Sequence, residues 1–136
     1  MRELEEYICG KRLGVGAYRS VYAFAPDSNF VVKVANENGR AVNLLEEKIW
    51  HDIWSTPLEK WFAPVKSVSE AGKYLIQERV EMMPKDKYPL MIPHFFTDTK
   101  YSNFGWLKGK FVCCDFGSFN MFRGVSPKMV KAKWWE

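Results

Sequence analysis

Several polar residues of this chain are of the types that bind phosphate and metal ions. The stretch VCCDFGSF, residues 112–119, carries Asp115 directly after an apolar run, and carboxylate oxygens are ligands that Mg²⁺ prefers. Near the other end of the sequence, Gly14 and Gly16 flank a single residue, and such a turn lets the backbone approach a ligand closely. The stretch FVVKVA places Lys33 within an apolar run, where an ammonium group is costly unless it is paired. The question is whether Asp115 is the metal-binding end of a phosphotransfer site.

The elements that must position these residues are mostly strands. Aromatic and β-branched residues separated by turn signals predict one strand and three strand-turn-strand units. The single strand is predicted at residues 30–35. The three strand-turn-strand units are predicted at residues 11–24, 62–82 and 105–114. One helix is predicted over 41–54, because apolar residues recur there at helical spacing, and Asn36 or Asn38 could cap it. A strand-rich first half with a single helix predicts an α+β fold.

Length and composition narrow the class of protein. A chain of 136 residues is long enough for one domain, residues 1–136, and its 47% apolar and 16% aromatic content supports a packed core. The formal charge of +4 is mild and no Lys/Arg block stands out, so we expect no nucleic-acid partner and read the basic end, KMVKAKWW, as a solvated tail. No apolar run is long enough to span a membrane. Three cysteines without a CxxC spacing predict neither a disulfide framework nor a zinc site, which favours a reducing, cytoplasmic compartment.

The order and spacing of the polar residues resemble the protein-kinase-like family. The Gly-Val-Gly turn is followed by a strand lysine, a helical glutamate, the stretch TDTKYSNFG and Asp-Phe-Gly, which is the order of that family's motifs. The similarity covers roughly residues 10–118. It implies a kinase-like small lobe, a twisted antiparallel sheet plus one helix, in about 1–80. Residues 81–136 would then hold the hinge, the catalytic loop, the metal-binding hairpin and a tail.

The resemblance implies that ATP is bound mainly by the first eighty residues. Gly14 and Gly16 match the first two glycines of the loop that covers the phosphates, while Arg19 stands where the third glycine is usual. Val21 matches the residue that packs on adenine. The backbone at the end of the last small-lobe strand would meet the adenine edge, with Gln77 at the back of the pocket, through Glu78 and Val80.

Lys33 matches the family's strand lysine, which contacts the α- and β-phosphates and pairs with a helix glutamate. In NLLEEKIW that partner is predicted to be Glu46. Its neighbour Glu47 is the alternative, because it would face about 100° away on the same helix.

The stretch TDTKYSNFG reproduces the spacing of the family's catalytic loop. By this resemblance Asp98 would accept or orient the proton of the substrate hydroxyl, and Lys100 would neutralise the γ-phosphate. Asn103 and Asp115 would hold Mg²⁺. The His-Arg pair that usually precedes the aspartate is replaced by Phe96-Thr97, so control by an activation-loop phosphate is not expected.

Two large pieces of the family's fold are missing from the pattern. Between Glu78 and Asp98 the chain has three prolines and no room for the usual long helix. After Gly117 too few residues remain for a peptide-binding platform. Something else must therefore hold the catalytic loop, and nearby aromatic residues are predicted to form a compact core there or, alternatively, an exposed patch for a second copy or a host protein. These residues are Phe95, Phe96, Phe104, Trp106, Phe119 and Phe122, with Trp134 and Trp135 able to serve either role.

Three functions from different classes remain open at this point. The first is an ATP- and Mg²⁺-dependent phosphotransferase that acts on a hydroxyl of an unknown protein or small molecule. The second is a nucleotide-binding pseudokinase that works as a protein-binding module or inhibitor. The third is a kinase-like remnant kept for its fold alone. The small size resembles compact kinase-like proteins encoded by bacteriophages, which would act in the cytoplasm of a bacterial host.

Overall fold

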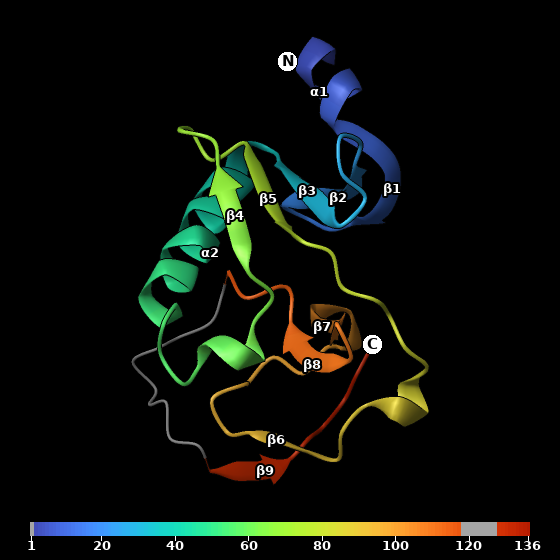
Figure 1. The fold of residues 1–136 in the computed structure, drawn as a ribbon, viewed down its shortest axis with the longest axis vertical. Coiled ribbons are helices and arrows are strands. Elements are labelled where there is room, and N and C mark those ends of the chain that lie inside the picture. Colours follow the sequence, from blue (N-terminus) through green and yellow to red (C-terminus); the bar gives the residue numbers. More distant parts are fainter. Residues whose placement is uncertain (1, 118–127) are drawn as a thin grey trace.

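The main sheet has five antiparallel strands, in the spatial order β1-β2-β3-β5-β4 (Figure 1). The computed structural model describes residues 2–117 and 128–136 of the chain. The strands of this sheet are β1 (Cys9–Val15), β2 (Arg19–Phe24), β3 (Phe30–Ala35), β5 (Tyr74–Glu78) and β4 (Val65–Val68). Because β3 is central, its backbone pairs on both sides, and Lys33 lies opposite Val21 on one neighbour and Leu75 on the other.

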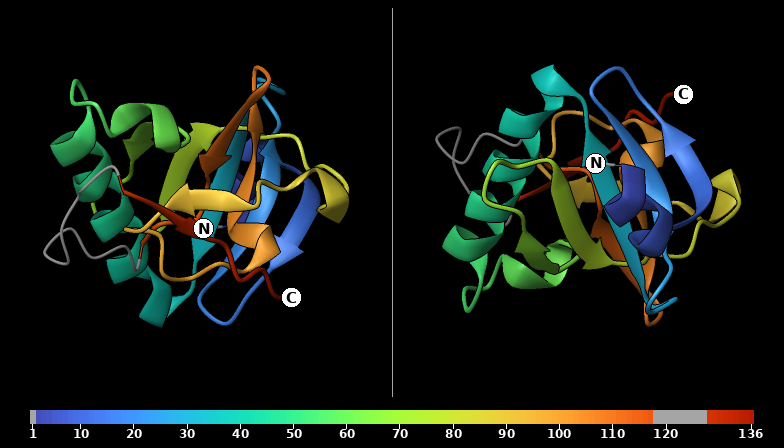
Figure 2. Two further views of the ribbon diagram at one scale, coloured as in Figure 1. Left: turned by 90° about the horizontal axis from the view of Figure 1, so that it is seen from below. Right: turned by 90° about the horizontal axis from the view of Figure 1, so that it is seen from above.

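A single long helix, α2 (Arg40–Ile53), lies along one side of this sheet (Figures 1 and 2). It follows a 3₁₀ turn at Glu37–Gly39, which Asn36 caps: the Asn36 side chain accepts a hydrogen bond from the Gly39 N–H at 2.9 Å. The prediction that Asn36 or Asn38 caps the helix is therefore wrong, because the N-cap residue of α2 is Gly39, which has no side chain to cap it, and Asn36 caps the preceding turn. A short helix, α1 (Arg2–Ile8), precedes β1.

The second half of the chain forms two small antiparallel ribbons below the main sheet. One pairs β7 (Phe104–Leu107) with β8 (Lys110–Cys113), and the other pairs β6 (Met91–Pro93) with β9 (Met129–Lys131). Further 3₁₀ turns occur at Glu59–Trp61, Lys85–Lys87 and Tyr101–Asn103. In the view from below, β6 and β9 lie in front of the main sheet (Figure 2).

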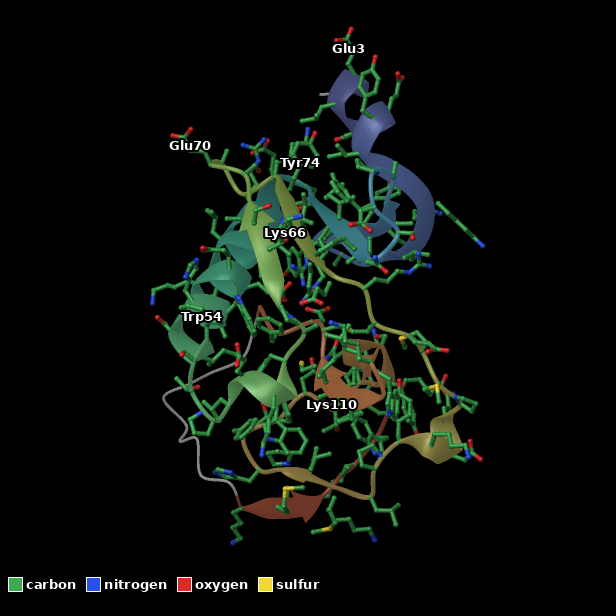
Figure 3. All side chains as sticks on the ribbon, in the orientation of Figure 1. Glu3, Trp54, Lys66, Glu70, Tyr74 and Lys110 are labelled. Carbon is green, nitrogen blue, oxygen red and sulfur yellow. The ribbon has the colours of Figure 1, made fainter. Side chains whose placement is uncertain are left out.

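One hydrophobic core joins the two halves. Ile49, Trp50 and Ile53 on the inner face of α2 belong to the same buried cluster as the aromatic residues of the second half. The centre is aromatic: the ring of Phe62 lies 5.0 Å from Phe116 at a near-perpendicular angle, an arrangement that adds to the burial of apolar area. Trp54, which follows α2 and lies at the edge of the molecule in Figure 3, is exposed, as is Lys110 on β8.

The predicted α+β class is confirmed, with one main helix and a largely antiparallel sheet. The predicted strand at 30–35 matches β3, and the predicted hairpin at 105–114 matches β7 and β8. The prediction of a solvated basic tail is wrong for part of its length, because β9 pairs with β6 and Trp134 packs against the core. Within the described part of the chain, no helix has both the length and the apolar character needed to cross a membrane.

Candidate functional site

A cleft of about 560 Å³ separates the main sheet from the loops that flank β7 and β8. Small-molecule sites in proteins typically have volumes of ~300–1,000 Å³. Residues predicted as site residues from both ends of the chain line this cleft. They are Gly14, Gly16, Val21, Lys33, Glu78, Val80, Asp98, Lys100, Asn103 and Asp115. Only Glu46, among the predicted positions, lies behind the wall rather than on it.

The glycine turn forms one wall of the cleft, and packing within the protein does not require glycine at either position. A Cβ atom added to Gly14 would meet no heavy atom within 4 Å, and one added to Gly16 would come no closer than 3.7 Å to the Arg19 carbonyl. Both glycines also have ordinary negative φ angles. A side chain here would therefore extend into open space along the cleft, which is the space that a close-packed ligand would need.

The floor of the cleft holds a buried ion pair between the sheet and the helix. The ammonium nitrogen of Lys33 lies 2.6 Å from Oε1 of Glu46 and also donates to the carbonyl of Cys114. The side chains are 5% and 0% exposed, so both charges are almost fully desolvated. The alternative, Glu47, is half-buried on the outer side of α2 and pairs with His51 at 2.8 Å. The structure therefore places Glu46, and not Glu47, beside Lys33.

Glu46 is held as an anion by its neighbours. Burial by itself raises the pKa of this carboxyl, but the charges and hydrogen bonds of Lys33 and Arg19 outweigh burial and lower the pKa to about 2. Its Oε2 also accepts the backbone N–H of Phe116 at 2.8 Å. One carboxylate thus connects β3, α2 and the segment that follows β8.

Arg19 is the functional residue that the sequence analysis missed. Its guanidinium donates to Oδ1 of Asn43 at 2.9 Å, to both oxygens of Glu46 at 3.1 and 3.2 Å, and to Oδ1 of Asp115 at 2.7 Å. Its position was read only as a missing glycine. A signal was available: Asn43 and Glu46 are three residues apart on the helix and so present two acceptors on one face.

The loop that carries Asp98 is tied to the metal-ligand candidates through backbone bonds. The Asn103 carbonyl accepts the N–H groups of Cys114 at 2.7 Å and Asp115 at 3.2 Å, and the Asn103 side-chain amide donates to the Asp98 carbonyl at 3.4 Å. Asp98 itself is exposed and lines the cleft. Asp98, Asn103 and Asp115, the residues that the resemblance implied, therefore line the same cleft.

The last residues of the chain support this loop from the other side. The Thr99 hydroxyl donates to the Lys133 carbonyl at 2.5 Å, and the Trp135 and Thr99 backbones are joined at 3.2 Å. The ammonium group of Lys100 lies 5.5 Å from the centre of the Trp135 ring, a cation–π contact. The loop is thus paired along its length with the segment after β9.

The aromatic residues beside the loop form the compact core that was predicted. Phe95, Phe96 and Phe104 are buried, while Trp106 packs against them. Trp134 stacks on the Tyr101 ring at 5.6 Å and donates its indole N–H to the Pro89 carbonyl at 2.9 Å. Trp135 is exposed. The two other aromatic candidates, Phe119 and Phe122, lie outside the described residues.

The far end of the cleft contains a buried polar atom without a partner. Gln77 is 1% exposed, and its Nε2 donates to the Ala63 carbonyl at 3.1 Å. Its Oε1 is one of two buried side-chain polar atoms, among the residues described, that have no hydrogen-bond partner. A buried unpaired acceptor is costly, and Gln77 lines the cleft.

The backbone next to Gln77 runs along the cleft. The Glu78 N–H donates to the Pro64 carbonyl at 3.0 Å, and Glu78 and Val80 both line the cleft. The segment then crosses to β7, where Glu81 and Trp106 exchange backbone hydrogen bonds at 2.8 and 2.9 Å. Val80 therefore lies at the point where the chain spans the cleft.

The donor set fits a magnesium ion that is completed by phosphate oxygens. Asp115 has a half-exposed side chain, and Arg19 occupies only its Oδ1. Asn103 uses its amide nitrogen on Asp98, so its oxygen is the atom left for a cation. No group of three or more His, Cys, Asp or Glu side chains that could hold a metal is found in residues 2–117 and 128–136. Mg²⁺ is commonly bound through one or two protein oxygens plus substrate phosphates, which is what this pair can offer.

No protein-family model matches this sequence, and no curated protein matches it.

Proposed function

We propose that this chain is an ATP- and Mg²⁺-dependent phosphotransferase with a protein-kinase-like small lobe. The observation that carries the proposal is the buried Lys33–Glu46 pair, which opens on the same cleft as Asp98, Asn103 and Asp115. A buried ion pair is weak support for stability because desolvation offsets its attraction. Its position at the edge of a ligand-sized cleft is better explained by a role toward an anionic ligand.

In this proposal the nucleotide lies along the cleft with its base toward Gln77. The backbone of Glu78 and Val80 meets the edge of the base, and Val21 packs on its face. The glycine turn covers the phosphates, and Lys33 donates to them from the floor. Bound ATP supplies the phosphoryl group, while Mg²⁺ held by Asn103 and Asp115 offsets its negative charge.

The residues of the loop then position the acceptor. Asp98 is exposed at the cleft, so its carboxylate can orient the acceptor hydroxyl and take its proton as the oxygen–phosphorus bond forms and the bond to the ADP oxygen breaks. Lys100, also on the cleft, offsets charge on the transferred group. Positioning and charge stabilisation are the main contributions that a protein makes to phosphoryl transfer.

A second function is a nucleotide-binding protein that acts on a partner without transfer. It is favoured by the position of the Lys100 ammonium group over the Trp135 ring. While Lys100 makes this contact, its charge is not directed to a phosphate in the cleft. In this alternative, the cleft binds ATP and the exposed surface near Trp135 contacts the partner, either a host protein or a second copy of this chain.

The experiment that separates the two functions compares wild type with Asp98→Asn. Production of ADP from MgATP and phosphorylation of the protein itself are measured, together with ATP affinity by calorimetry. We expect Asp98→Asn to abolish turnover and leave affinity unchanged. The matched control is Asp86→Asn, an exposed aspartate in the 3₁₀ turn at Lys85–Lys87, which should alter neither. Turnover that persists in Asp98→Asn contradicts the proposed role, and ATP binding by wild type without any turnover favours the second function.

A further inference from the structure

The site contains a cation that the resemblance does not account for. The guanidinium of Arg19 is 7% exposed, stands at the usual place of a glycine and borders the cleft. Burial of a charge is costly unless every donor is used. Here the donors are used on two separate parts of the chain, through Asn43 and Glu46 on α2 and through Asp115 after β8.

Each contact constrains a different part of the site. Asn43 is 0% exposed and donates its amide to the Gly72 carbonyl at 2.9 Å, so its Oδ1 is fixed as an acceptor for the guanidinium. Glu46 receives two parallel N–H bonds from Arg19, a bidentate geometry that fixes direction as well as distance. Because Asn43 and Glu46 hold the guanidinium in place on α2, the guanidinium in turn fixes the position of Asp115.

The contact with Asp115 is selective for one oxygen. The 2.7 Å bond is to Oδ1, while the Asp115 side chain is 51% exposed and lines the cleft, which leaves Oδ2 for a ligand. A residue that hydrogen-bonds one oxygen of a metal-ligating carboxylate orients the other toward the ion.

We propose that Arg19 is a positioning residue that orients Asp115 toward the metal ion and connects it to the Lys33–Glu46 pair. The inference rests on the proposed function, because it concerns how the same site takes up Mg²⁺. A lysine at this position would keep the charge but could not make the two parallel bonds to Glu46 while also holding Asp115, because its ammonium lacks the planar fork of the guanidinium.

The test measures ATP binding by calorimetry across a range of Mg²⁺ concentrations for wild type, Arg19→Lys and the control Arg12→Lys. Arg12 is exposed on β1 and does not line the cleft. Mg²⁺ should increase the ATP affinity of both proteins, but Arg19→Lys should need about tenfold more Mg²⁺, or more, to reach half of that increase. The affinity for ATP without metal should stay close to that of wild type. A purely structural role would weaken both affinities together and would overturn the inference.

Three other results would also overturn it. An Arg19→Lys protein that takes up Mg²⁺ more readily than wild type would show that Arg19 competes with the ion for Asp115. A wild type that binds no ATP at all would refute the proposed function, and this inference with it. If Arg19→Lys binds MgATP normally and its Mg²⁺ dependence equals that of wild type, only the inference is refuted. If Arg19→Lys does not fold, a crystal structure of wild type with Mg²⁺ and a non-hydrolysable ATP analogue decides: Arg19 remains bonded to Asp115 if the inference holds and has left it if not.

Discussion

Replacing Glu46 by Gln tests how much the buried charge of Glu46 contributes to stability. Glu46 is 0% exposed and accepts bonds from Lys33, Arg19 and the Phe116 N–H. The fall of its pKa from 4.5 to about 2 corresponds to about 3 kcal/mol of folding free energy, because each pKa unit is worth ~1.4 kcal/mol. Leaving buried cations without their partner costs ~3–5 kcal/mol in other proteins. We therefore expect Glu46→Gln to lower the unfolding free energy at pH 7 by about 3 kcal/mol.

The pH dependence gives the sign of the effect. Because the pKa of Glu46 is lower in the folded protein, its contribution is fully present above 4.5 and is lost as the pH falls to about 2. Urea unfolding of wild type and Glu46→Gln at pH 7, 5, 4 and 3 should therefore show a stability gap that narrows toward acid. A gap that stays constant with pH would refute the reasoning.

The neighbouring glutamate supplies the control for this experiment. Glu47 is half-buried, pairs with His51 on the helix surface and makes no contact with Lys33. Exposed i,i+4 pairs contribute ~0.3–0.5 kcal/mol, so Glu47→Gln should change stability by no more than that. A loss in Glu47→Gln as large as in Glu46→Gln would show that removal of any charge from α2 is enough.

Two other sites give predictions of stability and binding. A Cβ atom on Gly105 would lie 2.5 Å from Val80 Cγ2, so Gly105→Ala should lower the unfolding free energy by ~1–3 kcal/mol; a stability equal to wild type would refute the packing argument. Gly14→Ala meets no neighbour and should leave stability nearly unchanged while weakening ATP binding in calorimetry, and unweakened binding would remove the turn from the site. Trp134→Ala should destabilise by ~2–4 kcal/mol in urea unfolding and slow ADP production, because Trp134 packs beneath the loop. Trp135→Ala should cost less stability because Trp135 is 51% exposed, and equal losses would contradict this account.

The sequence was most informative where local patterns and spacing act together. The run FVVKVA predicted β3 to the residue, because β-branched residues between two turns leave few alternatives. Helical spacing placed α2 to within one residue at each end. Glu46 and Glu47 could not be separated with certainty by pattern alone, because adjacent positions on a helix differ only in direction and the register is fixed by tertiary packing.

What the sequence did not reveal depends on contacts between distant residues. Arg19 and Asp115 are bonded across most of the chain, and nothing local to Arg19 indicates a carboxylate there. The pairing of β9 with β6 and of Trp135 with Lys100 was missed for the same reason: a basic segment with two tryptophans is typical of a solvated tail when read alone. Both misses are contacts between residues far apart in the sequence, one made by a polar residue of the site and the other by the segment that supports it.

The most direct test of the central claim is thermal unfolding with and without ATP, each with and without Mg²⁺, on wild type and Lys33→Ala. A ligand at a hundredfold its Kd stabilises by ~2.7 kcal/mol, which for a domain of this size raises the Tm by roughly 8 °C. The account predicts such a Mg²⁺-dependent rise for wild type and its loss in Lys33→Ala, each measured against that protein's own baseline. No rise in wild type, or an equal rise in Lys33→Ala, would contradict the claim that this cleft binds the phosphates of ATP.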